Sequence, residues 1–97
     1  MLLLNMWVVS KFIIFGKVQG VFYRKFVSQS TMKKQLEGYI KNLSDGTVEV
    51  VVVLFDEDVE PFKKILNDGS PASVVERIEM QVLEEDDLIY DGFEIRS

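Results

Sequence analysis

An Asp45-Gly46 pair separates two apolar segments, residues 39–43 and 47–55, and this arrangement leaves the chain few alternatives to a β-hairpin. Aspartate and glycine accept the backbone angles of tight turns between antiparallel strands. In the second segment, valine and leucine occupy every second position from 48 to 54, so one face is apolar along its whole length. We therefore expect a hairpin with one buried face and a partly polar opposite face.

Two further elements are expected before the hairpin. Residues 7–15 are rich in valine, isoleucine and phenylalanine and end at a glycine, which predicts a strand buried on much of both faces. From Phe22 to about Lys34, an apolar side made of Phe22, Phe26 and Val27 predicts a short amphipathic helix.

Three elements are expected after the hairpin. Apolar residues from Val59 to Leu66 recur at helical spacing, with a proline in the first turn and a glycine after the end, so they predict a second helix. Alternating apolar residues in 77–82 predict a fourth strand, and residues 93–96 predict a short last strand. The acidic residues 84–87 are expected to form a solvated connection.

The expected order is strand, helix, strand, strand, helix, strand, with a short extra strand at the end. Two helices on one face of a largely antiparallel sheet would bury the apolar faces described above. This is an α+β, ferredoxin-like α/β sandwich, and residues 1–97 are expected to form a single domain. Because many functions share this fold, the fold alone does not indicate an activity.

The composition removes several kinds of chemistry. The chain of 97 residues has no cysteine and no histidine, which excludes thiol nucleophiles, thiolate metal sites and pairs of serine or cysteine with histidine. Its formal net charge of −5 argues against nucleic-acid binding, which depends on lysine and arginine neutralising phosphates. A compact anionic substrate would need a local cationic pocket.

The opening residues 1–9 resemble a signal peptide only superficially, since they lack a basic region and a clear cleavage site. We expect them to lead into the first strand. Polar residues interrupt the apolar sequence well short of the ~20 residues of a membrane-spanning helix. We therefore expect a cytoplasmic monomer that binds neither membranes nor nucleic acid.

The most informative stretch is residues 16–24, in which a strand ends, two glycines flank a loop and Arg24 opens a helix. Such a loop can point successive backbone N–H groups at an anion, and the helix N-terminus adds positive potential. Arg24 supplies a full charge, and its planar guanidinium can hold two phosphate oxygens. Glycine spacing alone also fits a plain turn followed by a solvated arginine.

Asn42 is a second candidate because it stands at the end of a predicted strand, just before the turn. Its amide can both donate to and accept from a water molecule. Asparagine near a turn also commonly bonds to nearby backbone groups.

These segments together resemble the acylphosphatase family. The family's first signature is Gly-x-Val-Gln-Gly-Val-x-Phe/Tyr-Arg, which residues 16–24 match at every defined position. The second joins glycine, an aromatic, an apolar and a basic residue to asparagine, with a glycine four positions later, and residues 38–46 match it. Similarity continues through residues 69–72 and 93–96, so the resemblance covers nearly the whole chain.

The resemblance implies hydrolysis of acyl phosphates to a carboxylate and inorganic phosphate, with no metal and no cofactor. It implies that Arg24 and Asn42 are catalytic, Asn42 by orienting the attacking water. It also implies that the phosphate is bound by Gln19, Gly20, Val21, Phe22, Tyr23 and Arg24. The carboxylate leaving group fits the absence of histidine, because its conjugate acid has a pKa of about 4 to 5 and needs no general acid.

Two other functions remain possible at this point. A phosphate-binding module without turnover, as in acylphosphatase-like domains of larger carbamoyl-transfer enzymes, would use the same fold. An RNA-binding module shares the strand and helix order, but it needs exposed aromatic residues on a basic surface. Lys17 could attract substrate at the rim of the site or be an ordinary surface lysine, whereas Tyr23 and Phe26 are expected in the core.

A few positions depart from the family pattern. Lys34 and Gln35 replace residues that are commonly apolar and glycine, and Leu54 replaces a common glycine. These changes leave the end of the first helix and the turn after the third strand open. Phe22 stands where glycine is common, and a bulky ring there could narrow the pocket and change substrate preference.

Overall fold

The computed structural model describes residues 7–83 and 91–97, and within them it contains the predicted elements in the predicted order. The helices and strands are β1 (Val8–Lys17), α1 (Tyr23–Lys33), β2 (Gly38–Asn42), β3 (Val48–Leu54), the short 3-10 helix η1 (Asp56–Asp58), α2 (Val59–Asp68), β4 (Val74–Leu83) and β5 (Phe93–Arg96). The expected connection at 84–87 lies outside the described residues, as does the start of the chain.

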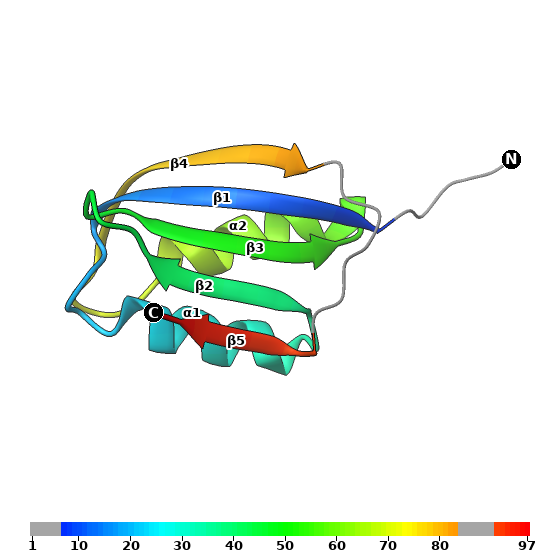
Figure 1. Ribbon diagram of the computed structural model, residues 1–97, viewed down its shortest axis with the longest axis horizontal. Coiled ribbons are helices and arrows are strands. Elements are labelled where there is room, and N and C mark those ends of the chain that lie inside the picture. The colour runs from blue at the N-terminus through cyan, green and yellow to red at the C-terminus, as the bar shows by residue number, and fades with distance from the viewer. Residues whose placement is uncertain (1–6, 84–90) are drawn as a thin grey trace, which may run out of the picture.

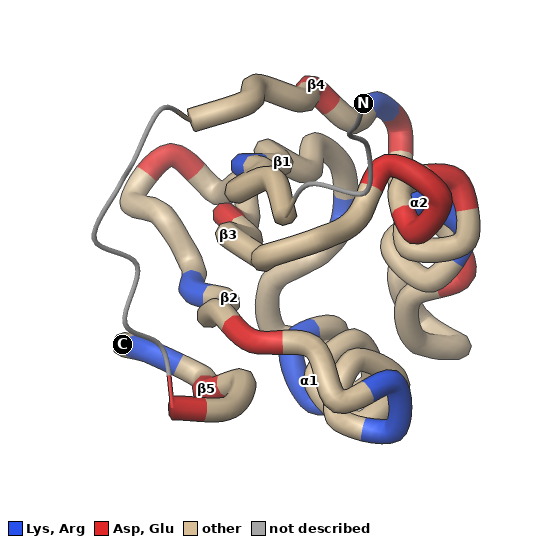
Figure 2. The backbone as a smooth tube through the Cα atoms, turned by 90° about the vertical axis from the view of Figure 1, so that its right-hand side faces the viewer, with Lys and Arg blue, Asp and Glu red and all other residues tan. Residues whose placement is uncertain are grey.

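The five strands form one sheet in the order β4-β1-β3-β2-β5. All neighbouring pairs are antiparallel except β2 and β5, which are parallel. Figure 1 shows the long β1 and β3 in the middle of the sheet, and Figure 2 shows α1 and α2 on the same side of it. The ferredoxin-like arrangement predicted from the sequence is therefore confirmed, including the short extra strand.

The core lies between the sheet and the two helices. The apolar face of β3 is fully buried there, and its residues are Val48, Val50, Val52 and Leu54. Phe12 of β1 and Phe62 of α2 meet with ring centroids 5.4 Å apart, which ties the second helix to the sheet. Burial of one such side chain contributes about 1.5–3 kcal/mol. Leu54 is therefore a core residue, although glycine is common at its position in the family.

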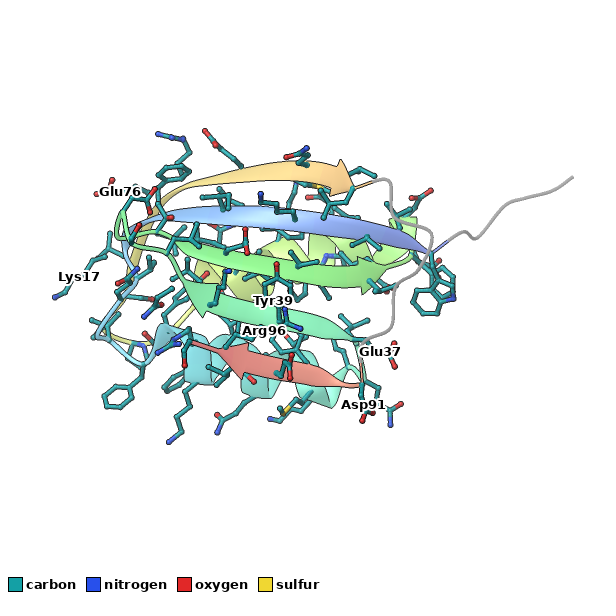
Figure 3. All side chains as sticks on the ribbon, viewed as in Figure 1. Lys17, Glu37, Tyr39, Glu76, Asp91 and Arg96 are labelled. Carbon is teal, nitrogen blue, oxygen red and sulfur yellow. The ribbon has the colours of Figure 1, made fainter. Side chains whose placement is uncertain are left out.

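The opposite face of the sheet is closed by polar contacts instead of helices. Glu49 of β3 is buried, and its carboxylate lies 3.5 Å from Lys11 Nζ and 3.9 Å from Lys41 Nζ. The hydroxyl of Tyr39 donates a 2.9 Å hydrogen bond to the same carboxylate, and the guanidinium of Arg96 lies over the Tyr39 ring. Figure 3 shows Tyr39 and Arg96 next to each other on β2 and β5. These partners compensate a buried charge that would otherwise be costly.

The predicted apolar side of α1 is partly wrong. Its buried residues are Tyr23, Val27, Ser28 and Thr31, whereas Phe26 is 40% exposed and Phe22 more so. The small polar residues can be buried because Thr31 Oγ1 donates a 2.7 Å hydrogen bond to the Val27 carbonyl oxygen within the helix. The expectation that Phe26 belongs to the core is therefore incorrect, while Tyr23 is in the core as expected.

The end of α1, left open by the sequence, is a tight turn. The N–H of Lys34 donates to the Thr31 carbonyl oxygen, and the N–H of Gln35 donates to that of Met32. Gln35 has a φ of 57°, a left-handed conformation that favours glycine. The helix thus ends just before Gln35, which adopts a conformation that favours glycine.

Candidate active site

The loop between β1 and α1 begins at a close backbone contact. At Gly16 the pairing of β1 with β4 shifts register, and a Cβ atom there would collide with the Val74 carbonyl oxygen. Val18 and Val21 insert their side chains into the core. Gly20 between them has a φ of 74°, which an L-residue rarely adopts. The loop therefore buries the side chains of Val18 and Val21.

Two side chains hold this loop from the elements beside it. Gln19 Nε2 donates hydrogen bonds of 2.8 Å to the carbonyl oxygens of both Leu43 and Thr47, at the base of the β2–β3 turn. Ser70 Oγ donates a 2.6 Å hydrogen bond to the Val21 carbonyl oxygen from the segment after α2. The side-chain amide nitrogen of Gln19 is thus engaged with the hairpin.

The backbone N–H groups from Gly20 to Arg24 donate no hydrogen bond within the part of the chain that the structure describes. These residues form the tip of the loop and the start of α1. The first N–H groups of any α-helix have no hydrogen-bond partner within that helix. Unpaired N–H groups at a helix N-terminus form a favourable site for an anion, because the helix dipole also raises the positive potential there.

The charges of the two helix N-termini differ in sign. The first turn of α1 carries Arg24 and Lys25 and no acidic residue, whereas the residues leading into and opening α2 are Asp56, Glu57, Asp58 and Glu60. Figure 2 shows this contrast, with blue on α1 and red at the start of α2. Acidic residues stabilise a helix N-terminus and basic residues do not. The basic start of α1 therefore costs helix stability and concentrates positive potential beside the loop.

Arg24 is held by the last strand. Its Nη1 donates a 2.9 Å hydrogen bond to the Arg96 carbonyl oxygen of β5. Among the described residues, Arg24 forms no salt bridge with a carboxylate. The guanidinium is thus oriented by a neutral acceptor and retains its positive charge for a ligand.

Asn42 is the last residue of β2 and has an unpaired buried oxygen. Its Oδ1 is buried and has no hydrogen-bond partner within residues 7–83 and 91–97. The nearby turn is stabilised by Asp45, whose Oδ1 accepts hydrogen bonds from the Thr47 hydroxyl at 2.6 Å and the Thr47 backbone N–H at 3.0 Å. Both hydrogen bonds lower the pKa of Asp45, and the bond from the Thr47 hydroxyl has the larger effect. Asn42 is therefore not used as a turn-stabilising residue.

The loop, Arg24 and Asn42 meet at one open pocket of about 310 Å³. Its lining residues are Val18, Gly20, Phe22, Tyr23, Arg24, Lys25, Asn42 and Ile95. Both residues expected to be catalytic therefore line the same pocket, from the start of α1 and the end of β2. Of the residues expected to bind phosphate, Gln19 and Val21 do not line it, since their side chains are engaged in the hairpin and the core.

A family model described as acylphosphatase matches residues 10–95, which include the loop, the pocket and at least part of every strand. The chain belongs to the acylphosphatase family. The acylphosphatase of Helicobacter hepaticus is 43% identical over 90 residues, which cover 88% of this chain and 93% of that protein. This chain is therefore an enzyme that hydrolyses the bond between the carboxyl and phosphate groups of acyl phosphates.

Solved structures show the same fold. The crystal structure of acylphosphatase from Bacillus subtilis superposes with a TM-score of 0.84 at 30% identity, covering 93% of this chain and 99% of that one. Full-length HypF in a phosphate- and nucleotide-bound form contains a similar unit, with a TM-score of 0.77 and 26% identity. That match covers 97% of this chain and 12% of HypF.

In this acylphosphatase the pocket includes one residue that the sequence did not indicate as part of the site. Ile95 of β5 lines the pocket because β5 pairs in parallel with β2, opposite Ile40. Its alternation with the buried Phe93 placed it on the helix side of the sheet, but no local motif marked it. Lys17 extends from the end of the sheet where β1 runs into the loop, as Figure 3 shows, and it does not line the pocket.

None of the helices in residues 7–83 and 91–97 is long and apolar enough to span a membrane.

Proposed function

We propose that this acylphosphatase binds the phosphoryl group of its substrate through Arg24 and the backbone N–H groups of residues 19–24, and that Asn42 orients the attacking water. The observation that supports this most directly is the run of unpaired N–H groups beside an arginine that has no carboxylate partner among the described residues. Those donors would surround the phosphoryl oxygens, on which charge builds up in the transition state.

Asn42 stands where a water molecule could be held beside that phosphoryl group. Its buried Oδ1 has no partner within the described part of the chain, and a buried amide oxygen without a hydrogen bond is unfavourable. A water in the pocket would be oriented by a hydrogen bond with the Asn42 amide, which can both donate and accept. Asn42 lines the pocket together with Arg24, so the water and the phosphoryl group would share one space.

In this mechanism the water oxygen attacks phosphorus opposite the acyl oxygen, and the bond between phosphorus and that oxygen breaks. The carboxylate departs with the bonding electrons, and the water proton passes to a phosphate oxygen of the product. The carboxylate leaves as a stable anion because carboxyl groups have a pKa of about 4, so no general acid is required. We therefore propose that the reaction proceeds without a metal or cofactor.

We also propose that the protein acts as a cytoplasmic monomer. The absence of cysteine suits a reducing compartment, and the net charge of −5 disfavours binding to nucleic acid.

The testing experiment is hydrolysis of benzoyl phosphate in the presence of a chelator by the wild type, Arg24→Ala and Lys33→Ala. Lys33 is the matched control because it is a cation on the same helix, in its last turn, and does not line the pocket. We expect Arg24→Ala to lose at least 100-fold in kcat/KM, on the order of the effect of removing one transition-state donor. Lys33→Ala should lose much less. Circular dichroism would establish that each variant is folded.

The role of Asn42 is tested separately with Asn42→Ala. We expect kcat to fall while the inhibition constant for inorganic phosphate changes little, because the amide would act on water and not on the phosphate. An unchanged kcat would exclude the water-orienting role. If the folded wild type bound phosphate but showed no turnover, the non-catalytic binding module would be the better description.

A further inference from the structure

Phe22 is the most exposed of the large apolar side chains at the pocket. Its side chain is 74% exposed, and it occupies the N-cap position of α1 without making a capping hydrogen bond. Its φ of 62° and ψ of 20° lie in the left-handed region, which is unfavourable for an aromatic residue. An exposed ring and a strained backbone both cost stability, so neither is explained by folding alone.

The ring lines the pocket, and Ile95 provides a second apolar group there. Ile95 is 48% exposed and comes from β5, whereas Phe22 comes from the loop before α1. The same pocket contains Arg24, Lys25 and Asn42. It thus has a cationic part suited to a phosphate and an apolar part that contacts no phosphate. Ligand pockets commonly combine an apolar lining with a few polar groups that fix orientation in this way.

We propose that Phe22 and Ile95 form an acyl-binding subsite that makes this enzyme select acyl phosphates with an aromatic acyl group over those with a short one such as acetyl. This inference rests on the proposed phosphate-binding role of the loop, because a phosphate held by Arg24 would leave the acyl group beside these two side chains. A flat aromatic acyl group would cover the exposed ring of Phe22 and gain from stacking, whereas an acetyl group has too little surface to do so.

The pocket volume is consistent with a small aromatic substrate. At about 310 Å³ the pocket lies near the lower end of the ~300–1,000 Å³ typical of ligand sites. Removing a small apolar contact from a hydrophobic site changes selectivity by about 10- to 200-fold. We therefore expect an effect of about 10-fold, since both Phe22 and Ile95 stay partly exposed to solvent.

The experiment measures kcat/KM for benzoyl phosphate and for acetyl phosphate in the wild type and four variants. Phe22→Gly removes the ring and suits the left-handed backbone, Phe22→Leu keeps an apolar side chain without a flat ring, and Ile95→Ala shortens the second apolar group. Phe26→Ala is the matched control, because Phe26 is an exposed aromatic residue in the first turn of α1 that does not line the pocket.

We expect the ratio of the two kcat/KM values to favour benzoyl phosphate in the wild type and to fall about 10-fold in Phe22→Gly. Smaller decreases are expected in Phe22→Leu and Ile95→Ala, with no change in Phe26→Ala. A ratio that is the same in the wild type and Phe22→Gly would overturn the subsite.

The outcomes separate this inference from the proposed function. If the wild type hydrolyses both substrates and Arg24→Ala neither, the phosphate site stands whatever the ratio shows. If Arg24→Ala retains full activity on both substrates, the proposed phosphate site fails, and the inference that rests on it fails as well.

Discussion

The Ser70 hydroxyl donates a 2.6 Å hydrogen bond to the carbonyl oxygen of Val21, 49 positions earlier in the chain. Ser70 is buried and is itself fixed by Ser73, whose Oγ accepts from the Ser70 N–H at 3.0 Å and donates to the Ser70 carbonyl oxygen at 2.8 Å. The segment after α2 therefore holds the loop at the pocket, although it does not line the pocket itself.

Ser70→Ala should loosen the loop. The change leaves the buried Val21 carbonyl oxygen without its partner, which is expected to cost about 1–3 kcal/mol of unfolding free energy. We also expect weaker binding of inorganic phosphate, because the N–H groups after Val21 would no longer be held in place. Urea denaturation and isothermal titration with phosphate measure the two effects.

Thr31→Ala is the control for Ser70→Ala. It removes a buried hydroxyl hydrogen bond of similar length, from Thr31 to the Val27 carbonyl oxygen, inside α1 and away from the pocket. It should lower stability without changing phosphate affinity. Equal phosphate affinities in Ser70→Ala and the wild type would show that Ser70 is only structural.

Gln19→Glu should uncouple the loop from the hairpin that carries Asn42. The change replaces the donating Nε2 with an oxygen that faces the carbonyl oxygens of Leu43 and Thr47, so two hydrogen bonds become repulsive contacts. We expect a loss of about 1–3 kcal/mol in stability together with a lower kcat. Gln29→Glu adds the same charge to an exposed position of α1 and should change neither quantity. Comparable urea midpoints for the two variants would contradict this role of Gln19.

Asp45 should make the stability of the hairpin turn depend on pH in the acid range. Hydrogen bonds from Thr47 lower its pKa in the folded protein below the ordinary value of 3.8. A lowered folded pKa means that the stabilising contribution is complete well above pH 3.8 and is lost as the pH falls through the folded value. Asp45→Asn lacks this titration. Urea denaturation from pH 6 to pH 2.5 would measure the difference in unfolding free energy between the wild type and Asp45→Asn. This difference should shrink at the acid end. A constant difference would contradict a lowered pKa for Asp45.

Tyr23→Phe should weaken the contact between the two helices. The Tyr23 hydroxyl donates a 2.7 Å hydrogen bond to the Leu66 carbonyl oxygen, which lies in the last turn of α2 and has no partner within that helix. Losing this bond is expected to cost about 1–3 kcal/mol at pH 7. Thermal or urea unfolding would measure this loss.

The same variant tests the effect of burial on Tyr23. Burial raises the pKa of its hydroxyl above the ordinary value of 10.0. A raised folded pKa means that the stability contribution is present below pH 10 and is lost as the pH rises above it. The advantage of the wild type over Tyr23→Phe should therefore decrease above pH 10, and an advantage that persisted unchanged would argue against a buried neutral hydroxyl.

Arg24 and Asn42, which local sequence singled out, line one pocket, whereas residues brought in from a distance were not indicated by the sequence. The glycines of the loop and the arginine after them indicated an anion site because their chemistry is local. Ile95 and Ser70 approach the loop only through the pairing of β5 with β2 and the packing after α2. Phe26 was misplaced because a helical apolar side can be turned toward solvent when Ser28 and Thr31 pack more closely against the core.

The sequence by itself determined the order of the elements, because alternating and helical patterns of apolar residues reflect which side of each element is buried. The turn residues likewise determined the hairpin. Only the tertiary structure decided that Arg24, Asn42 and Ile95 line one pocket, since they come from α1, β2 and β5 and meet through strand pairing. The same packing left Asn42 Oδ1 without a protein partner and engaged the side chain of Gln19, which are consequences of distant contacts that no local pattern contains.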